Sequence, residues 1–187
     1  MRRLSSFAPL VVLAGLLGGC AANHYQTGLF DAEYQQPYTL ASGDRLRVLV
    51  FGQDALSNSY SVDGAGQISM PLIGPVRADG QSARGMERAI EAKLRNGFLR
   101  DPKVSVEVEA YRPFFVLGEV TAAGQYPYIN GMTVQNAVAV AGGYTPRASQ
   151  SAANLTRIID GRPYTGQVPM TQPVRPGDTI TVKERFF

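Results

Sequence analysis

The chain of 187 residues contains a single cysteine, Cys20, so it cannot close an internal disulfide bond. In an oxidising compartment, its fold must therefore be held by packing and hydrogen bonds alone. Cys20 lies near the N-terminus, after a basic start and an apolar run that ends at Leu17. About 165 residues follow it, enough to bury the core of one domain or of two small domains.

Residues 1–19 have the features of a secretion signal: a positive start, an apolar stretch, and two glycines at its end. The apolar stretch is shorter than the about 20 residues that a permanent membrane span needs. Because Cys20 follows directly, the segment resembles the lipobox at which bacterial lipoproteins are cleaved and acylated. This resemblance implies lipidation of Cys20, and Ala21 favours the outer membrane as the destination. The alternative is a buried free thiol in an ordinary leader.

Removal of the leader leaves a nearly neutral chain. Arg2 and Arg3 lie within it, so 18 basic residues become 16 against 15 acidic residues, and the net charge falls from +3 to +1. Binding to nucleic acid needs clustered Lys and Arg, so we exclude that class of partner.

Residues 20–37 are polar, without sustained periodicity, and we predict a lipidated tether that joins the lipid to the first folded element at Tyr38. The only histidine, His24, lies in this segment, where a solvated side chain is expected. Since the chain has no second His or Cys, we expect no metal site and no cofactor.

Residues 38–110 predict a small α+β domain. Apolar residues alternate over 46–50 and 104–108, which indicates two half-buried strands, and another strand is expected at 67–70. Between them, Ser82 can cap a helix whose apolar face holds Met86, Ile90 and Leu94, with Glu91 and Arg95 paired on the outside.

Residues 111–187 predict a second, β-grasp-like domain that begins where Pro113 interrupts the strand pattern. Strands are expected at 114–120, 155–159 and 179–182, with a short strand after Gly124 and a hairpin turn at Asp160-Gly161. The same pattern predicts one helix, capped by Thr133 and ended by Gly142-Gly143.

A short pattern, Gly-Asp-x-apolar-x-Val, occurs twice, at Gly43-Asp44 and at Gly177-Asp178. Glycine suits the turn conformation, and the Asp side chain can cap the turn before the strand begins. We interpret both as turns that lead into strands, and not as phosphate loops or catalytic pairs.

Together these segments resemble the outer-membrane polysaccharide export (Wza-like) family. The first unit is similar to its polysaccharide export sequence domain, and the second to its SLBB domain, which is a β-grasp. The family-motif residues, which we expect to be structural, are Gly43, Asp44, Asp63, Gly64, Pro71, Gly74, Pro102, Gly118, Gly124, Gly142, Gly143, Gly177 and Asp178.

The resemblance implies a homo-oligomeric ring on the periplasmic face of the outer membrane, a conduit for a capsule or exopolysaccharide polymer. It also implies an inner-membrane polysaccharide copolymerase as partner, and no catalysis. Larger members continue past the last strand into an amphipathic pore helix. We therefore expect a separate outer-membrane pore to complete the exit.

Two other classes of function compete with export. A glycosidase needs two carboxylates flanking a cleft, and the nominal candidates are Asp63, Asp101, Glu107, Glu109 and Glu119. These lie in turns, at strand edges or on a solvated strand face, and a nucleophilic site lacks a suitably placed Cys or His. A lipoprotein that binds a glycan or small ligand without forming a conduit is the alternative that stays open.

Overall fold

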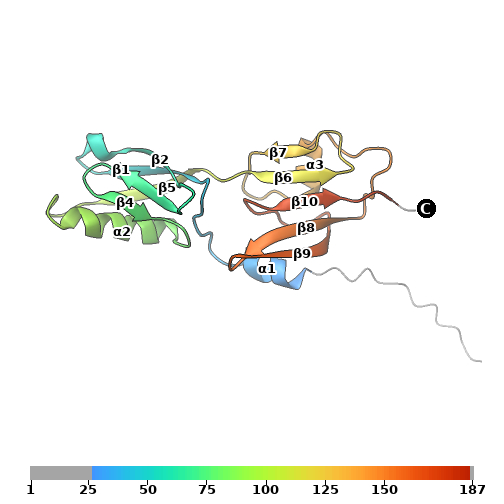
Figure 1. Cartoon of the computed structure of the whole chain (residues 1–187), viewed down its shortest axis with the longest axis horizontal. Coiled ribbons are helices and arrows are strands. Elements are labelled where there is room, and N and C mark those ends of the chain that lie inside the picture. The colour runs from blue at the N-terminus through green and yellow to red at the C-terminus, as the bar shows by residue number, and fades with distance from the viewer. Residues whose placement is uncertain (1–26, 186–187) are drawn as a thin grey trace, which may run out of the picture.

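The computed structural model describes residues 27–185, and Figure 1 shows them as two domains side by side along the long axis. Each domain has its own hydrophobic core. One core runs from Leu40 to Val106, and the other combines Phe114 to Val182 with Phe30. The lipidation candidate Cys20 and the predicted leader lie outside the described residues.

The first domain contains two small sheets and one long helix. Strands β1 (Arg45–Val50), β2 (Asn58–Ser61) and β5 (Val104–Ala110) form an antiparallel sheet in the order β2-β1-β5. Strands β3 (Gln67–Met70) and β4 (Gly74–Arg77) pair as a hairpin, and a 3-10 turn, η1 (Asp54–Leu56), precedes β2. Helix α2 (Ala83–Arg95) buries Met86, Ile90 and Leu94 against these strands.

The predicted strands at 46–50, 67–70 and 104–108 are confirmed. The predicted cap is confirmed as well, because the Ser82 side chain accepts a hydrogen bond from the Gly85 N–H at 3.1 Å. The predicted pairing of Glu91 with Arg95 is wrong. Glu91 instead accepts the N–H of Val104 at 3.2 Å. β5 is an edge strand with unpaired N–H groups, and satisfying one outweighs the few tenths of a kcal/mol of an exposed helical ion pair.

The second domain is a five-stranded sheet with helix α3 (Val134–Val140) packed on one face. The strands are β6 (Phe114–Gly118), β7 (Gly124–Tyr126), β8 (Ala152–Ile159), β9 (Arg162–Pro169) and β10 (Thr179–Val182), in the order β7-β6-β10-β8-β9. Strand β10 pairs in parallel with β6 and antiparallel with β8, so the last strand lies at the centre. The predicted α+β class with a β-grasp-like second domain is confirmed.

Local turn chemistry sets the register of this sheet. Asp160 and Gly161 have positive φ values of 50° and 74°, which gives the two-residue hairpin that joins β8 to β9. Thr133 and Asn136 form the reciprocal capping box at the start of α3. At the other end, Gly142 and Gly143 adopt positive φ as the helix stops.

One expectation for the N-terminal segment is wrong: regular structure begins before Tyr38. Residues Gly28–Tyr34 form a short helix, α1, which lies against the second domain beside β9 (Figure 1). Phe30 of α1 is buried in the second core. The sequence did not predict this helix because only one of its side chains, Phe30, is buried, and the rest of the contact is polar. A single buried residue leaves no periodic pattern.

Gly118→Ala should destabilise the second domain. Gly118 has φ +85°, and a Cβ there would lie 2.1 Å from the Val182 carbonyl oxygen on the neighbouring strand. We expect a loss of about 2 kcal/mol or more in the free energy of unfolding, measured by calorimetry. Gly124→Ala is the matched control, since nothing lies within 4 Å of its Cβ position. Equal stability of the two variants would contradict the close approach.

Candidate functional site at the junction of the two domains

Arg157 of β8 is a buried cation at the place where α1 meets the second domain. Its side chain is 3% exposed, and it points inward in the same alternation as Leu155. The guanidinium donates to both oxygens of Asp178, from Nε at 2.9 Å and from Nη2 at 2.7 Å. Such two-point pairing of Arg with a carboxylate is strong and directional.

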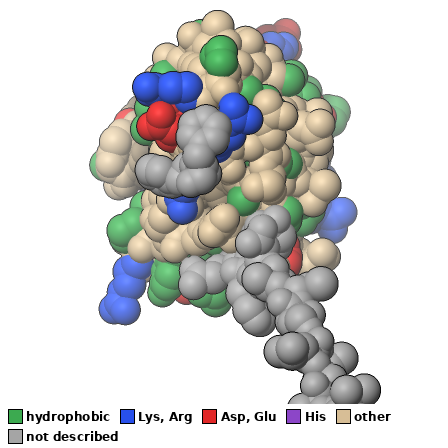
Figure 2. Space-filling view, turned by 90° about the vertical axis from the view of Figure 1, so that its right-hand side faces the viewer, with side chains coloured by type: hydrophobic (Ala, Val, Ile, Leu, Met, Phe, Trp, Pro, Cys, Tyr) green, Lys and Arg blue, Asp and Glu red, His purple; other side chains and the backbone are tan. Residues whose placement is uncertain are grey.

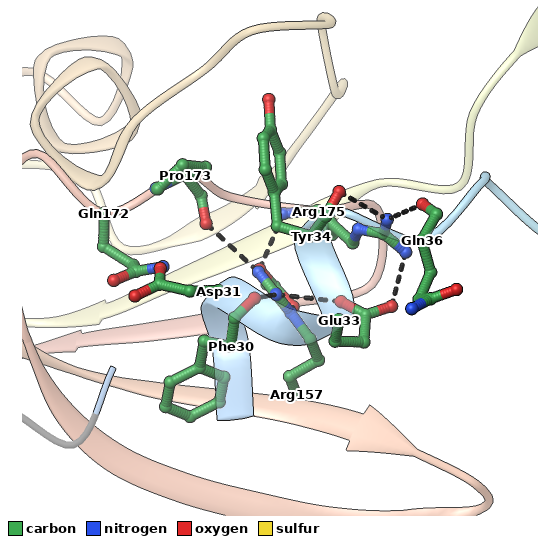
Figure 3. Close-up of polar contacts among 10 residues, drawn as sticks. Phe30, Asp31, Glu33, Tyr34, Gln36, Arg157, Gln172, Pro173 and Arg175 are labelled. Atoms are coloured by element: carbon green, nitrogen blue, oxygen red, sulfur yellow. Dashed lines mark hydrogen bonds and ion pairs between the residues drawn. The ribbon is translucent and has the colours of Figure 1, made fainter. Parts of the chain in front are cut away.

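The remaining donors of Arg157 contact α1 and Pro173 (Figure 3). Nη1 donates to Glu33 Oε2 at 2.9 Å and to the Phe30 carbonyl at 3.2 Å, and Nη2 also donates to the Pro173 carbonyl at 3.1 Å. All five N–H groups of the guanidinium are therefore used. The guanidinium carbon also lies 5.5 Å from the centroid of the Phe30 ring, within reach of a cation–π contact.

Two further side chains fasten α1. Arg175 donates to the carboxylate of Glu33 and to the carbonyls of Tyr34 at 3.1 Å and Gln36 at 2.6 Å. These carbonyls belong to the end of the helix, where backbone acceptors lack helical partners. Gln172 donates to Asp31 at 2.9 Å. The segment in front of the first domain is thus bound to the second domain as a strap, defined here as residues 28–36.

Burial raises the pKa of the Asp178 carboxyl, while the guanidinium of Arg157 and the Arg175 N–H oppose that rise. The two hydrogen bonds from Arg157 keep the pair in its ionised form. Within residues 27–185, no buried side-chain nitrogen or oxygen lacks a hydrogen-bond partner. A satisfied network of this kind acts as a fixed joint and has no free proton donor or acceptor to offer a substrate.

A second buried carboxylate, Asp44, organises the first domain's side of the junction. Its Oδ2 accepts the Tyr38 hydroxyl at 2.6 Å and the Ala41 N–H at 2.9 Å, and its Oδ1 accepts the Arg112 N–H at 2.9 Å. Burial raises the pKa of the Tyr38 phenol, and so does its hydrogen bond to Asp44, so the hydroxyl keeps its proton. The same hydroxyl accepts from Arg112 Nη1 at 2.9 Å.

The two Gly-Asp turns have the same geometry. Asp178 Oδ2 accepts the N–H of Arg175, three residues earlier, at 2.7 Å, just as Asp44 accepts that of Ala41. The predicted interpretation as turns leading into strands is confirmed. The sequence did not indicate that one residue, Arg112, would lie against both turns.

Arg112 and its neighbours join the domains. A Cβ on Gly43 would lie 3.3 Å from the Arg112 Cβ, and one on Gly177 would lie 2.7 Å from its Nε, so both turns approach this residue closely. Next to it, the Tyr111 ring packs edge-on against Tyr38 at 5.0 Å and against Tyr128 at 5.5 Å. These rings form a continuous aromatic contact from one domain to the other.

A cavity of about 670 Å³ opens between the strap and the two domains. Its lining includes Leu29 and Ile158, which are both exposed and apolar, and the charged side chains of Asp79 and Arg112. The part of the chain that the structure describes contains no group of three or more His, Cys, Asp or Glu side chains able to hold a metal ion.

The structure brings four of the predicted motif residues together at this junction: Gly43, Asp44, Gly177 and Asp178. The others serve local structure at separate places. Asp63 Oδ1 accepts the N–H groups of Ala65 and Gln67 in the turn that contains Gly64. Pro71 follows β3, Gly74 begins β4, Pro102 is buried ahead of β5, Gly118 ends β6, Gly124 begins β7, and Gly142 and Gly143 follow α3.

Sequence reasoning missed the residues that hold the junction, namely Glu33, Arg112, Arg157 and Arg175. One signal was present for Arg157. In the predicted strand at 155–159, it occupies the same inward parity as Leu155, and a charged residue on a buried face needs a buried partner. No comparable signal marks Glu33, because its partners are distant in the sequence.

Charge on the described surface is dispersed. Figure 2 looks onto the end of the second domain, where Lys and Arg side chains lie scattered, without a continuous basic patch on the part that is visible and described. Glu119 and Arg147 pair at 3.2 Å, and the hydrogen bonds from Thr145 and Arg147 lower the pKa of Glu119.

Comparison with known proteins identifies both domains. Residues 32–109 match the family described as polysaccharide biosynthesis/export protein, and residues 113–168 match the SLBB domain. The exopolysaccharide production protein ExoF of Rhizobium meliloti (strain 1021) is 34% identical over 148 residues, which cover 76% of this chain and 34% of that protein. The polysialic acid transport protein KpsD of Escherichia coli is 26% identical over 146 residues, covering 74% of this chain and 25% of its own length.

The chain therefore belongs to the Wza-like polysaccharide export family, with one export domain followed by one SLBB domain. Members of this family are transport proteins and not enzymes. The chain spans about a third of ExoF and a quarter of KpsD. Among residues 27–185, no helix is long and apolar enough to span a membrane.

Arg157→Met should release the strap. The substitution leaves Asp178 and Glu33 without their buried cation, and breaking such a pair costs about 3–5 kcal/mol. We expect a lower melting temperature and rapid proteolytic cleavage within residues 28–36. Arg162→Met, at an exposed position of the same hairpin, should change stability by no more than about 0.5 kcal/mol.

A double variant separates loss of the ion pair from loss of packing. Arg157→Met combined with Asp178→Leu removes both charges, so it should recover part of the lost stability. If the double variant is less stable than Arg157→Met by the full cost of a second independent substitution, the two residues do not act as a pair.

Proposed function

We propose that this protein is a periplasmic component of a capsule or exopolysaccharide export machine, held at the outer membrane by a lipid on Cys20. The observation that carries the proposal is the match of both domains, in the same order, to an exopolysaccharide production protein at 34% identity. The charge network at the junction is compatible with it, because the buried groups of that network are all paired and hold the two domains together.

The strap relates the anchor to the folded domains. Residues 28–36 bind the second domain, so a lipid on Cys20 would hold the second domain near the membrane, although it is the later domain in the sequence. Six residues separate Cys20 from Thr27, so the distance between these two residues is at most about 25 Å. The first domain would then point away from the outer membrane, toward an inner-membrane copolymerase.

Assembly into a ring of identical subunits is the second part of the proposal. The sheets have unpaired edges at β2, β7 and β9, and large apolar side chains are exposed on both domains. The most exposed in the first domain are Phe51 and Leu72, at 70% and 61%. Surfaces of this kind favour contact between copies. The separate outer-membrane pore stays a prediction.

Cys20→Ser should leave an unlipidated precursor and abolish surface polysaccharide without unfolding the domains. The serine hydroxyl cannot replace the thiol that the lipobox presents for acylation. Acyl labelling with membrane fractionation measures the first effect, and complementation of a deletion strain measures the second. Wild-type protein without an acyl chain would overturn the anchor, and normal export in the deletion strain would overturn the role in export.

Crosslinking of the lipidated protein in native membranes should give a ladder of homo-oligomers, because unpaired sheet edges and the membrane both concentrate copies against one another. Cys20→Ser is the matched control for the membrane's contribution and should shift the ladder toward monomer. A strictly monomeric wild-type protein would favour the other candidate, a lipoprotein that binds a glycan in the cavity at the junction without forming a conduit.

A further inference from the structure

The second domain's sheet has one face that none of the helices within residues 27–185 covers. Helix α3 and the core pack on one side, and the strand alternation turns a second set of side chains to the other side. The strand pairing places Phe115 opposite Thr179, and Thr179 opposite Thr156. A hydrogen bond of 2.8 Å between the hydroxyls of Thr156 and Thr165 continues the row onto β9.

A second row runs parallel to the first. Leu117 lies opposite Thr181, Thr181 opposite Asn154, and Asn154 opposite Gln167. We call this surface the open face. Its members are Phe115, Leu117, Gln125, Asn154, Thr156, Ile158, Pro163, Thr165, Gln167, Thr179 and Thr181.

The open face carries hydroxyl, amide and apolar side chains and no charged one. The outward face of the first domain's sheet is different, because Arg45, Arg47, Glu107 and Glu109 are all exposed there. Exposed positions of soluble domains normally mix both signs of charge. An extended uncharged polar surface therefore fits a ligand that is itself rich in neutral donors and acceptors.

The arrangement on the open face favours a glycan over a second protein copy. The core of a protein interface is apolar and its rim is polar. Here the central strands, β10 and β8, present Thr and Asn, while the exposed apolar residues lie toward the margins, with Phe115 and Leu117 on β6 and Ile158 at the end of β8. Sugar rings offer hydroxyl groups at their edges and C–H groups on their faces, which suit this combination.

We propose that the open face is a contact surface for the exported polysaccharide, which it binds weakly through neutral hydrogen bonds and apolar contacts. The inference rests on the proposed role in export. Binding without ion pairs leaves contacts that a moving chain can exchange for water, and it makes affinity insensitive to salt. Ile158 also lines the cavity at the junction, so the face continues toward the first domain.

Threonine methyl NMR on the lipidated full-length chain in micelles tests the face directly. The probe is a pool of neutral dextran oligosaccharides, titrated at low and high salt. We expect the methyl signals of Thr156, Thr165, Thr179 and Thr181 to shift in both conditions. The signals of Thr133 and Thr145, which lie outside both the open face and the lining of the junction cavity, should not move.

Paired variants separate the face from a general loss of structure. Phe115→Ala with Asn154→Ala should weaken binding roughly tenfold, equivalent to about 1.4 kcal/mol. Arg47→Ala with Leu49→Ala, on the outward face of the first domain's sheet, should leave it unchanged. Both pairs replace exposed or half-exposed side chains, so we expect each variant to fold. Methyl spectra recorded without sugar check this, because a folded variant keeps the wild-type signals.

The inference is wrong if dextran shifts none of the open-face methyl signals, or if both variant pairs weaken binding equally. It is also wrong if the open-face signals shift with protein concentration alone, because a second copy of the protein then covers the face. None of them touches the proposed role in export, which fails only if the deletion strain exports polysaccharide normally.

Discussion

The ion pair between Arg157 and Asp178 is the constraint on which the rest of this structure depends. A guanidinium buried among apolar residues is tolerated only when every donor is paired, and here all five N–H groups have acceptors. Three of the acceptor atoms belong to Asp178 and Pro173 of the second domain, and two belong to Phe30 and Glu33 of the strap. The buried charge therefore selects one position for α1.

Because of the strap, the segment that precedes the first domain in the sequence lies against the second domain in space. The chain leaves its N-terminal segment, binds the second domain through residues 28–36, builds the first domain, and returns through Tyr111-Arg112-Pro113. Arg112 then contacts both Gly-Asp turns, and Tyr111 packs between Tyr38 and Tyr128. The two domains are consequently joined at two places, the strap and the Arg112 segment.

The two sheets offer different surfaces to their surroundings. The first domain's outward face is charged, with Arg45 and Arg47 near Glu107, whereas the second domain's open face is neutral. Charged faces gain from pairing with complementary charges on a partner protein, and a neutral hydroxylated face suits a sugar polymer. The two domains therefore present surfaces of different chemistry.

Much of this fold follows from local pattern. Period-two alternation located β1 and β5, and the turn residues before β3 and β10 located those two strands. The capping residues Ser82 and Thr133 located the starts of α2 and α3. These signals act over a few residues and need no distant partner. The two Gly-Asp motifs form turns that lead into β1 and β10, as their residues predicted. β2 and β4 were missed since they are short and carry weak alternation.

The sequence by itself determined the two α+β units, their order, their family and the Gly-Asp turns. Only the tertiary structure decided what those turns contact, where the strap binds and which sheet face stays open. Arg157 and Glu33 are 124 residues apart, and the partner of a buried charge is fixed by packing rather than by spacing. For the same reason, the inward parity of Arg157 indicated that a partner was needed, while the folded chain alone supplied Asp178 and Glu33.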